Sequence, residues 1–299
     1  MSFKEIIVLG AGAIGSTFGA LLSRRNNVTL IGRKMHVDVI NKSGLFLSGG
    51  ISGRFLVRAK TVIDEIPVDT LIILTTKAHD AASAVAQIKP LLREDTVMLI
   101  LQNGLGIKDT VEKVVDDKTE VVRGLVTSAA EFFEPGKISS WQGETILEST
   151  RTSERIAGIF CEAGLKTIIS SEMQEEIWNK LVVNCVLNPL TAILQVRNKN
   201  ILLDSLREIR HGIVRECINV GKAEGICFQS NLEECVDRKI ARYTNFSSMY
   251  QDIMKQKKTE IDFLNGKIVE LGKKHGIPTH INAFLVGLIK FLEKRENEA

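Results

Sequence analysis

The sequence has few of the residues that mark disulfide-rich, unstructured or strongly charged proteins. Among 299 residues there are five cysteines and five prolines, and the formal net charge is only +3. Such a small charge provides no basic field for a nucleic acid and no acidic tail. Repeats and low-complexity stretches are also missing, so we expect a folded chain without a long linker. The expected partner is a small, weakly charged molecule.

Cysteine and histidine are too scattered for a metal site. The cysteines are odd in number and include no Cys-x-x-Cys pair, and the five histidines include no His-x-x-x-His pair. We therefore expect no bound metal, and free thiols are typical of a reducing cytoplasm. Lys4 and Glu5 directly precede the first apolar run, which leaves no room for a secretory leader. No run predicts a membrane span, so we expect a cytoplasmic protein.

The first half of the chain alternates β-rich runs with helical patterns. Alternation of this kind predicts a parallel sheet covered by helices. The expected elements are strands at 6–9, 28–31, 71–74 and 97–100 and a helix at 17–22. Further strands are expected at the far edge of this sheet, at 55–59, 121–127, 137–141 and 145–147.

Helical periodicity dominates the second half. The expected helices are 156–163, 173–194, 203–224, 232–241, 249–274 and 281–295. A change of composition near residue 170 predicts two domains, residues 1–170 and residues 171–299. The expected fold class is α/β, with an N-terminal Rossmann-type doubly wound sheet and an all-helical C-terminal domain. The apolar stripes of the long helices are compatible with a homodimer and equally with an internal core.

A glycine motif follows the first predicted strand and opens the first helix, which is the context that the Gly-x-Gly-x-x-Gly fingerprint of dinucleotide sites requires. Gly10 permits the tight turn, Gly12 lets the backbone approach a pyrophosphate, and Gly15 allows close packing of helix on strand. Backbone amides and the helix dipole then hold the phosphates. The predicted cofactor-binding residues of this motif are Gly10, Ala11, Gly12, Ala13, Ile14 and Gly15.

The residues after the second predicted strand favour NADP over NAD. An acidic residue there would accept from the ribose 2′-hydroxyl, whereas this chain has Gly-Arg-Lys at 32–34. Arg33 suits a 2′-phosphate, and Lys77 adds a cation at the same edge of the sheet. Both are also compatible with ordinary surface residues. Asn103 lies on this edge too, although Asn-Gly is a common turn pair.

Lys180, Asn184 and Asn188 are spaced by four, which places one ammonium and two amides along one face of a helix. The surrounding segment 178–190 is otherwise typical of a buried helix. Such a row can hold a small polar molecule. The alternative is a polar stripe satisfied by the protein itself, with Asn188 next to a kink caused by Pro189.

Two further candidates lie between residues 247 and 266. Ser248 has the spacing of a capping box with Gln251, and the same hydroxyl at a helix start could bind a carboxylate. Glu260 brings a carboxylate into an apolar segment. Its alternative is a solvated pair with Lys257 or Lys258.

Together these segments resemble the ketopantoate reductase (2-dehydropantoate 2-reductase) family. The matching pieces occur in family order from residue 6 to about residue 280, and the last two are specific to this family. They are the motif at 10–15, Thr-Lys-Ala at 76–78, Gln-Asn-Gly at 102–104, the segment 178–190 and the segment 247–262.

The resemblance implies a fold, an activity and residue roles. It implies a C-terminal domain of the 6-phosphogluconate dehydrogenase type and NADPH-dependent reduction of 2-dehydropantoate to (R)-pantoate, on the route to pantothenate and coenzyme A. Lys180 and Glu260 are the implied catalytic pair. The implied substrate contacts are Asn103, Asn184, Asn188 and Ser248, and Asn103 and Glu260 also contact NADPH.

The residue types suit this chemistry. Negative charge grows on a keto oxygen as hydride arrives, and Lys180 can stabilise that charge and donate a proton. Residues 139–145 depart from the family pattern, since they lack the histidine and second glycine common before the next strand. Two alternatives therefore stay open: an NAD(P)-dependent reductase of another branched 2-keto acid, and a non-catalytic NADP-sensing protein.

Overall fold

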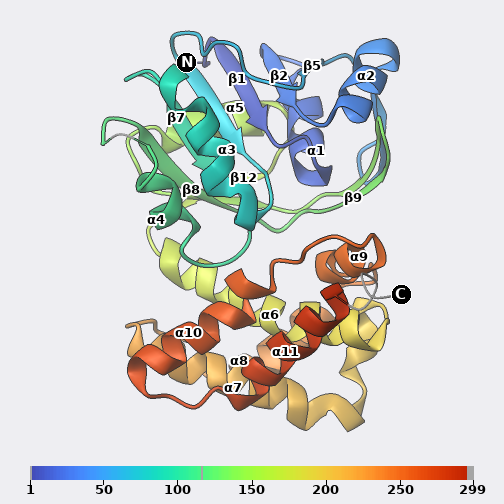
Figure 1. Ribbon diagram of the computed structural model, residues 1–299, viewed down its shortest axis with the longest axis vertical. Coiled ribbons are helices and arrows are strands. Elements are labelled where there is room, and N and C mark those ends of the chain that lie inside the picture. The colour runs from blue at the N-terminus through green and yellow to red at the C-terminus, as the bar shows by residue number, and fades with distance from the viewer. Residues whose placement is uncertain (1, 116, 295–299) are drawn as a thin grey trace. The chain divides into compact units, whose positions relative to one another are not determined.

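The computed structural model describes residues 2–115 and 117–294. It divides into two compact units, the first comprising Met1–Gln102 and Gly106–Met173 and the second comprising Asn103–Leu105 and Gln174–Ala299. The first unit has a mostly parallel sheet with helices and the second unit is helical (Figure 1), so the expected fold class is confirmed.

Eight strands form the main sheet of the first unit, in the order β12-β11-β8-β7-β6-β1-β2-β5. All neighbours are parallel except β8 and β11. The strands are β1 (Glu5–Leu9), β2 (Val28–Ile31), β5 (Arg58–Lys60), β6 (Thr70–Leu74), β7 (Val97–Ile100), β8 (Glu120–Val126), β11 (Thr145–Glu148) and β12 (Thr167–Ser170). From β5 to β8 the order is that of the Rossmann fold, and it reverses between β1 and β6.

Helices and short 3₁₀ turns connect these strands. They are α1 (Ala13–Leu22), α2 (Lys34–Ser43), η1 (Ala78–Asp80), α3 (Ala81–Ile88), η2 (Lys89–Leu91), α4 (Ile107–Glu112) and α5 (Ser153–Glu162). Phe18 of α1 and Phe160 of α5 are fully buried, and their rings meet edge to face with centroids 5.4 Å apart. Such aromatic pairs stabilise a core beyond the area they bury, so α1 is anchored firmly behind the glycine motif.

A second sheet of four strands covers α1 and was not expected. Its order is β4 (Gly53–Phe55), β3 (Leu45–Gly49), β10 (Lys137–Trp141) and β9 (Ala129–Glu134). The predicted strand at 55–59 was therefore wrong, because Phe55 pairs with Leu45 in this sheet and Ala59 pairs with Leu30 in the main sheet. The strand at 137–141 exists, but it is β10 and does not lie at the edge of the main sheet.

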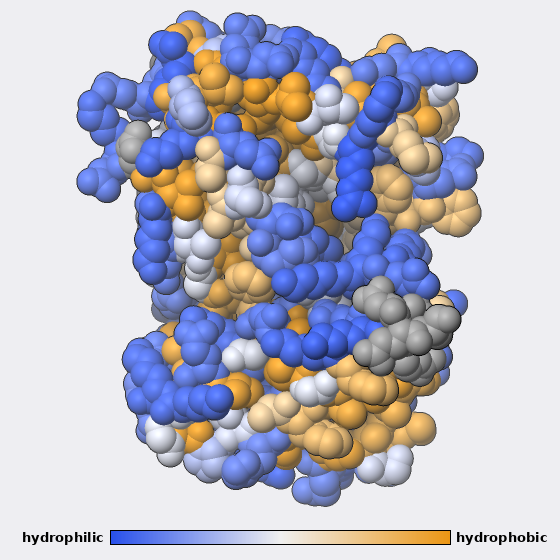
Figure 2. Space-filling view, viewed as in Figure 1, coloured by the Kyte–Doolittle hydropathy of each residue, from blue (hydrophilic) through white to orange (hydrophobic). Residues whose placement is uncertain are grey.

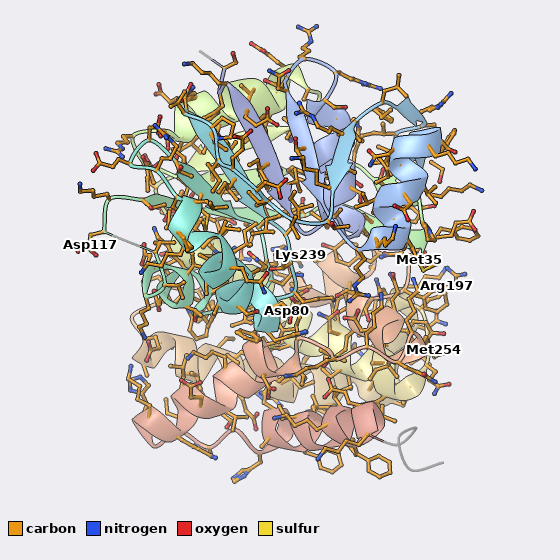
Figure 3. All side chains as sticks on the ribbon, turned by 45° about the horizontal axis from the view of Figure 1, so that its top comes forward. Met35, Asp80, Asp117, Arg197, Lys239 and Met254 are labelled. Atoms are coloured by element: carbon orange, nitrogen blue, oxygen red, sulfur yellow. The ribbon has the colours of Figure 1, made fainter. Side chains whose placement is uncertain are left out.

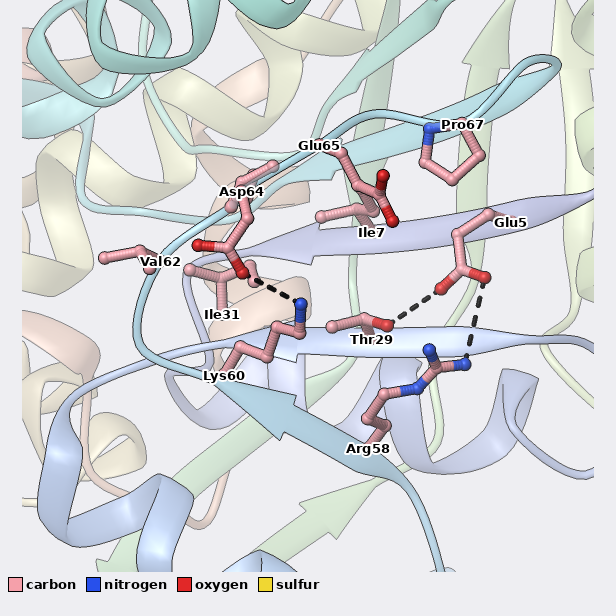
Figure 4. A pocket seen from close by; sticks show the side chains of 11 residues that line it. Glu5, Ile7, Thr29, Ile31, Arg58, Lys60, Val62, Asp64, Glu65 and Pro67 are labelled. Atoms are coloured by element: carbon pink, nitrogen blue, oxygen red, sulfur yellow. Dashed lines mark hydrogen bonds and ion pairs between the residues drawn. The ribbon is translucent and has the colours of Figure 1, made fainter.

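A small pocket lies against β1, β2 and β5 (Figure 4). Its volume is about 60 Å³, room for only a few water molecules. The polar groups that line it bond to each other: the Thr29 hydroxyl donates to Glu5 over 2.8 Å, and Lys60 pairs with Asp64 at 2.9 Å. This pocket is part of the scaffold and is no candidate for a cofactor.

The second unit is helical. Its elements are α6 (Met173–Leu194), η3 (Asn198–Leu202), η4 (Asp204–Leu206), α7 (Arg207–Ala223), α8 (Leu232–Ile240), α9 (Ser248–Met254), η5 (Ile261–Phe263), α10 (Asn265–His275) and α11 (His280–Lys294). By length and composition alone α6 could cross a membrane, but 72% of its most apolar window is buried in the protein. A core helix meets the same criterion, so this is weak evidence for a membrane span.

The single helix predicted for residues 249–274 was wrong. The structure has α9 and α10 there, separated by the short turn η5. Gln256 has a φ of +52°, a left-handed conformation that ends a helix. Glu260 therefore lies in a break between helices, where its backbone is free of the regular helical pattern.

An apolar stripe is exposed on α11. Phe284 and Phe291 are 65% and 62% exposed and are spaced by seven residues, which puts them on one face of the helix. Figure 2 shows apolar residues on the side of the second unit that carries this helix.

Candidate functional site

The glycine motif forms the turn from β1 into α1. Gly10 has a φ of +113°, and a Cβ there would lie 2.5 Å from the amide nitrogen of Thr76. A Cβ at Gly15 would lie 2.2 Å from the Gly10 carbonyl oxygen. At Gly12, by contrast, a Cβ would meet no atom within 4 Å. Packing therefore explains Gly10 and Gly15, whereas the open space at Gly12 leaves room for a ligand against the backbone.

The first turn of α1 suits an anion. Gly12 is the N-cap and has no side chain to accept from the amides of that turn. Ala11 is buried, and Ala13 and Ile14 are half-buried, so the turn is only partly accessible. The helix dipole adds positive potential at this end. These residues fit the pyrophosphate of a dinucleotide.

Arg33 and Lys77 lie after the two strands that flank β1. Arg33 is the exposed N-cap of α2, on the same turn as Met35, which is 73% exposed (Figure 3). Lys77 is half-buried and already takes part in an interaction. Because β2 and β6 both run parallel to β1, both cations lie at the carboxyl edge of the sheet, where the strand order reverses.

His36, which the sequence analysis did not single out, holds the start of α2. Its Nδ1 accepts from the Gly136 amide over 2.9 Å, and its Nε2 lies 3.0 Å from the Ser16 hydroxyl oxygen. Since a backbone N–H only donates, the ring proton is on Nε2. Burial lowers the pKa of His36 to about 4. The neutral ring thus ties the turn that carries Arg33 to α1 and to the β9–β10 turn.

The polar row of Lys180, Asn184 and Asn188, which was predicted from their spacing of four residues, lies on α6. Lys180 and Asn184 are half-buried, while Asn188 is 4% exposed. Lys180 takes part in an interaction with its surroundings, and Pro189 lies inside the helix as expected. The row therefore leads from the partly accessible ammonium to an amide in the core.

Ser247, and not Ser248, caps α9. The Ser247 Oγ accepts from the Tyr250 amide over 3.1 Å and lies 2.7 Å from the Thr191 Oγ1 of α6. The predicted capping box of Ser248 with Gln251 was therefore wrong. Ser248 is the first residue of the helix and is exposed, so its hydroxyl has no capping role that would compete with a ligand.

Glu260 is only 8% exposed, so the alternative of a solvated surface pair was wrong. Hydrogen bonds fix the backbone on both sides of it. The Thr259 amide donates to Glu293 Oε1 of α11 over 2.7 Å, and the Ile261 amide donates to the Thr259 hydroxyl over 3.2 Å. Glu260 itself takes part in an interaction. The carboxylate is thus held in a desolvated, ordered segment.

The Asn103 turn packs against this segment. The Leu105 amide donates to the Phe263 carbonyl over 3.2 Å, and a Cβ at Gly104 would lie 2.6 Å from the same oxygen. Asn103 is half-buried. The turn therefore has a tertiary role, and it brings Asn103 next to the segment that carries Glu260.

Asn198 is a candidate that the sequence analysis missed. It is 2% exposed, its Nδ2 donates to Asn245 Oδ1 over 3.2 Å, and its backbone amide donates to the Asn245 carbonyl over 3.1 Å. Its own Oδ1 is buried and has no hydrogen-bond partner among the residues that the structure describes. Such an oxygen needs a donor, which a ligand hydroxyl can supply. The nearness of Asn245 to Ser247 in the sequence was the only available signal.

The predicted ammonium, the buried carboxylate, the serine and the amides thus all lie in the second unit. Lys180, Asn184, Asn188, Ser248, Glu260 and Asn103 all belong to it. An ammonium of this kind can polarise a carbonyl and give it a proton. Within residues 2–115 and 117–294, no group of three or more histidines, cysteines or acidic residues is placed to hold a metal ion.

Sequence comparison identifies relatives along the whole chain. Residues 6–151 match the family model described as ketopantoate reductase PanE/ApbA, and residues 172–293 match the model of its C-terminal region. The 2-dehydropantoate 2-reductases of Pyrococcus horikoshii and Pyrococcus abyssi are 36% and 35% identical to this chain. These alignments cover 97% and 98% of this chain, and 97% and 99% of the relatives.

Solved structures with the same fold include two at 30% identity. One is a PanE/ApbA family ketopantoate reductase from Ralstonia eutropha, with a TM-score of 0.91. The other is D-mandelate dehydrogenase in a ternary structure with NADH and anilino(oxo)acetate, with a TM-score of 0.90. Each comparison covers 98% of this chain and 99% of the other. Matched by both family models and by full-length relatives above 30% identity, the chain belongs to the ketopantoate reductase family.

Proposed function

We propose that this chain reduces 2-dehydropantoate to (R)-pantoate with NADPH, on the route to pantothenate and coenzyme A. The observation that carries the proposal is that Lys180, on one helical face with Asn184 and Asn188, and the buried Glu260 belong to the same unit. Relatives that align over nearly the full length are 2-dehydropantoate 2-reductases, which supports this substrate.

Lys180 is the proposed general acid. NADPH, when bound, supplies a hydride to the keto carbon of the substrate. The Lys180 ammonium stabilises the negative charge that develops on the keto oxygen, gives that oxygen a proton, and regains a proton from water. Glu260, buried and fixed through its neighbours, orients the ammonium and the reacting oxygen.

The amides and the serine hold the rest of the substrate in this proposal. Asn184 and Asn188 bind the terminal hydroxyl of the keto acid, and Ser248 helps to hold its carboxylate. Asn103 contacts both the substrate and the cofactor. The unpartnered oxygen of Asn198 is a further acceptor for the hydroxyl.

We infer NADPH as the cofactor, in place of NAD. The six residues of the glycine motif would hold the pyrophosphate, and Arg33 and Lys77 would hold the 2′-phosphate, with Glu260 as a further cofactor contact. The support is the cationic Arg33 on the exposed cap of α2, where an NAD site has an acidic residue. The structure of D-mandelate dehydrogenase contains NADH, so the fold alone does not select NADPH, and the cofactor needs a direct measurement.

The purified protein tests this function through the loss of reduced nicotinamide absorbance. We would compare 2-dehydropantoate with 2-oxoisovalerate, which lacks the terminal hydroxyl, and NADPH with NADH. Fast turnover with 2-dehydropantoate and NADPH alone is the expected result. Turnover that is equal for the two acids would instead indicate a reductase of another branched 2-keto acid. NADPH binding without any turnover would indicate a sensor.

We also infer a cytoplasmic enzyme, which the five free cysteines support. A homodimer stays a prediction, and the exposed stripe of Phe284 and Phe291 is a surface on which a second copy could pack. Light scattering tests it directly, because the chain has a mass of 33.1 kDa and a dimer has twice that mass.

A further inference from the structure

Pro189 leaves one carbonyl of α6 without its helical partner. In a regular helix the amide of residue 189 would donate to the carbonyl of Cys185, but proline has no N–H. Cys185 is completely buried, so water cannot replace the lost donor, and an unpaired buried carbonyl is costly. The side-chain Nδ2 of Asn265 fills this position, at 2.9 Å from the Cys185 oxygen.

The direction of the Asn265 amide is fixed by its neighbours. The Glu216 carboxylate accepts from the backbone amides of Ile281 and Asn282, at 2.9 and 3.0 Å, and from Asn282 Nδ2 at 2.7 Å. Because a carboxylate only accepts, Asn282 must turn its Oδ1 toward Asn265, which donates to it over 2.9 Å. Both hydrogens of Asn265 Nδ2 are therefore used, one for Asn282 and one for Cys185.

This hydrogen bond joins the helix that carries Lys180 to the helix that follows the Glu260 segment. Cys185 follows Asn184 on the helix of Lys180, while Asn265 begins α10, five residues after Glu260. We propose that Asn265 is a positioning residue: it replaces the hydrogen bond that Pro189 removes and holds the Lys180 helix against the Glu260 segment. The inference rests on the proposed function.

Pro189 also lies between the proposed contacts of α6 and the residue that links this helix to the cap of α9. Lys180 and Asn184 precede it, whereas Thr191, two residues after it, lies 2.7 Å from the capping hydroxyl of Ser247. Both parts of α6 are therefore tied to neighbouring elements, through Cys185 to α10 and through Thr191 to the cap of α9. An alanine at 189 would let the helix satisfy the Cys185 carbonyl by itself, and the link from Asn265 to this carbonyl would then no longer be needed for that hydrogen bond.

Four variants test the proposal: Asn265→Leu, Pro189→Ala, the double variant, and Asn219→Leu as the control. Asn219 is an exposed residue of α7, so it undergoes the same side-chain change outside the network. For each protein, melting temperature, kcat and KM for 2-dehydropantoate, and KM for NADPH would be measured.

We expect Asn265→Leu to lower kcat/KM for the keto acid about 10-fold or more, mainly through kcat, since a small misplacement of reacting groups has effects of this size. KM for NADPH should change less than about 2-fold, because its proposed phosphate contacts lie in the first unit. The loss in melting temperature should be smaller in the Pro189→Ala background, where alanine supplies the missing amide. Activity should not return there, because the alanine amide restores the helical hydrogen bond but not the link between α6 and α10.

The outcomes separate this inference from the proposed function. Wild-type turnover in Asn265→Leu, or an equal loss of melting temperature in both backgrounds, would overturn the positioning role alone. A wild-type protein without turnover would overturn the proposed function and the positioning role with it. If the leucine variant does not fold, Asn265→Ser, whose shorter side chain does not reach Cys185, gives the same test.

Discussion

Lys180 is the residue on which the proposed chemistry depends most. It is half-buried on α6, so substrate can reach it while much of the surrounding helix is in the core. We expect Lys180→Ala to lower kcat by on the order of 10²- to 10⁴-fold, the usual contribution of a positioned general acid. KM for NADPH should change little. Steady-state kinetics with 2-dehydropantoate measure both.

Lys222→Ala is the matched control for this prediction. Lys222 is an exposed lysine in the last turn of α7, so its loss changes the net charge equally without reaching the site. Near-normal turnover in Lys180→Ala, with the control also normal, would remove Lys180 from the acid role.

Arg33 decides the proposed cofactor preference. A charge-assisted hydrogen bond contributes about 1.5–3 kcal/mol, which corresponds to roughly 10- to 100-fold in affinity. We therefore expect Arg33→Asp to raise KM for NADPH by a factor in this range and to leave KM for NADH nearly unchanged. Arg25→Asp, at an exposed position after α1, controls for the change in net charge. An unchanged ratio of the two constants would contradict the phosphate contact.

The sequence could predict some site residues and not others for a physical reason. The row of Lys180, Asn184 and Asn188 was predictable because helical spacing is a local property. His36 and Asn265 were not, because their roles depend on partners 100 and 80 residues away. Even the local cap was assigned one residue late, since Ser247 and Ser248 have the same side chain and only the tertiary contact with Thr191 distinguishes them.

At the scale of whole elements, periodicity predicted the type of an element better than its partners. The helix at 173–194 was predicted with its observed bounds, and β1, β2, β6 and β7 were close to theirs. The second sheet was missed because strand pairing between distant segments, such as β3 with β10, leaves no local pattern. The break after α9 was missed although the polar run at 255–260 interrupts the apolar spacing there, because a run of charged residues is also compatible with the exposed face of a helix.

His36 makes the anchoring of α2 sensitive to pH. The folded protein keeps this ring neutral down to a pKa of about 4, whereas the unfolded chain binds a proton below about 6.5. Between these values the unfolded state binds more protons, so stability falls as the pH decreases, by up to about 3 kcal/mol. The loss begins near pH 6.5 and is complete below about pH 4.

Urea unfolding at pH 7 and pH 4 measures this effect when wild type is compared with His36→Gln. The wild-type protein should lose more stability than the variant, which has no ring to protonate. His280→Gln, which removes an exposed histidine at the start of α11, should behave like wild type. Equal losses in wild type and His36→Gln would show that His36 is not the group responsible.

At the scale of the whole molecule, each unit has its own hydrophobic core. A ligand that binds one unit can therefore raise the stability of that unit directly. One core lies between residues 3 and 165 and the other between 178 and 289. NADPH at 100 times its dissociation constant should stabilise the native state that binds it by about 2.7 kcal/mol. We therefore expect calorimetry to show a rise in the melting temperature of the first unit.

The Gly12→Val variant tests NADPH binding at the glycine motif separately from the packing of that turn. A Cβ at Gly12 meets no atom within 4 Å, and its φ of −79° is accessible to any residue. The valine variant should therefore melt like wild type without NADPH but lose the NADPH-induced rise, because the side chain occupies the space proposed for the pyrophosphate. Gly15→Val should melt lower even without NADPH, since its Cβ would collide with the Gly10 carbonyl. If the Gly12 variant kept the full rise, the pyrophosphate could not lie against this turn, and the phosphate site would have to be sought elsewhere on the sheet edge.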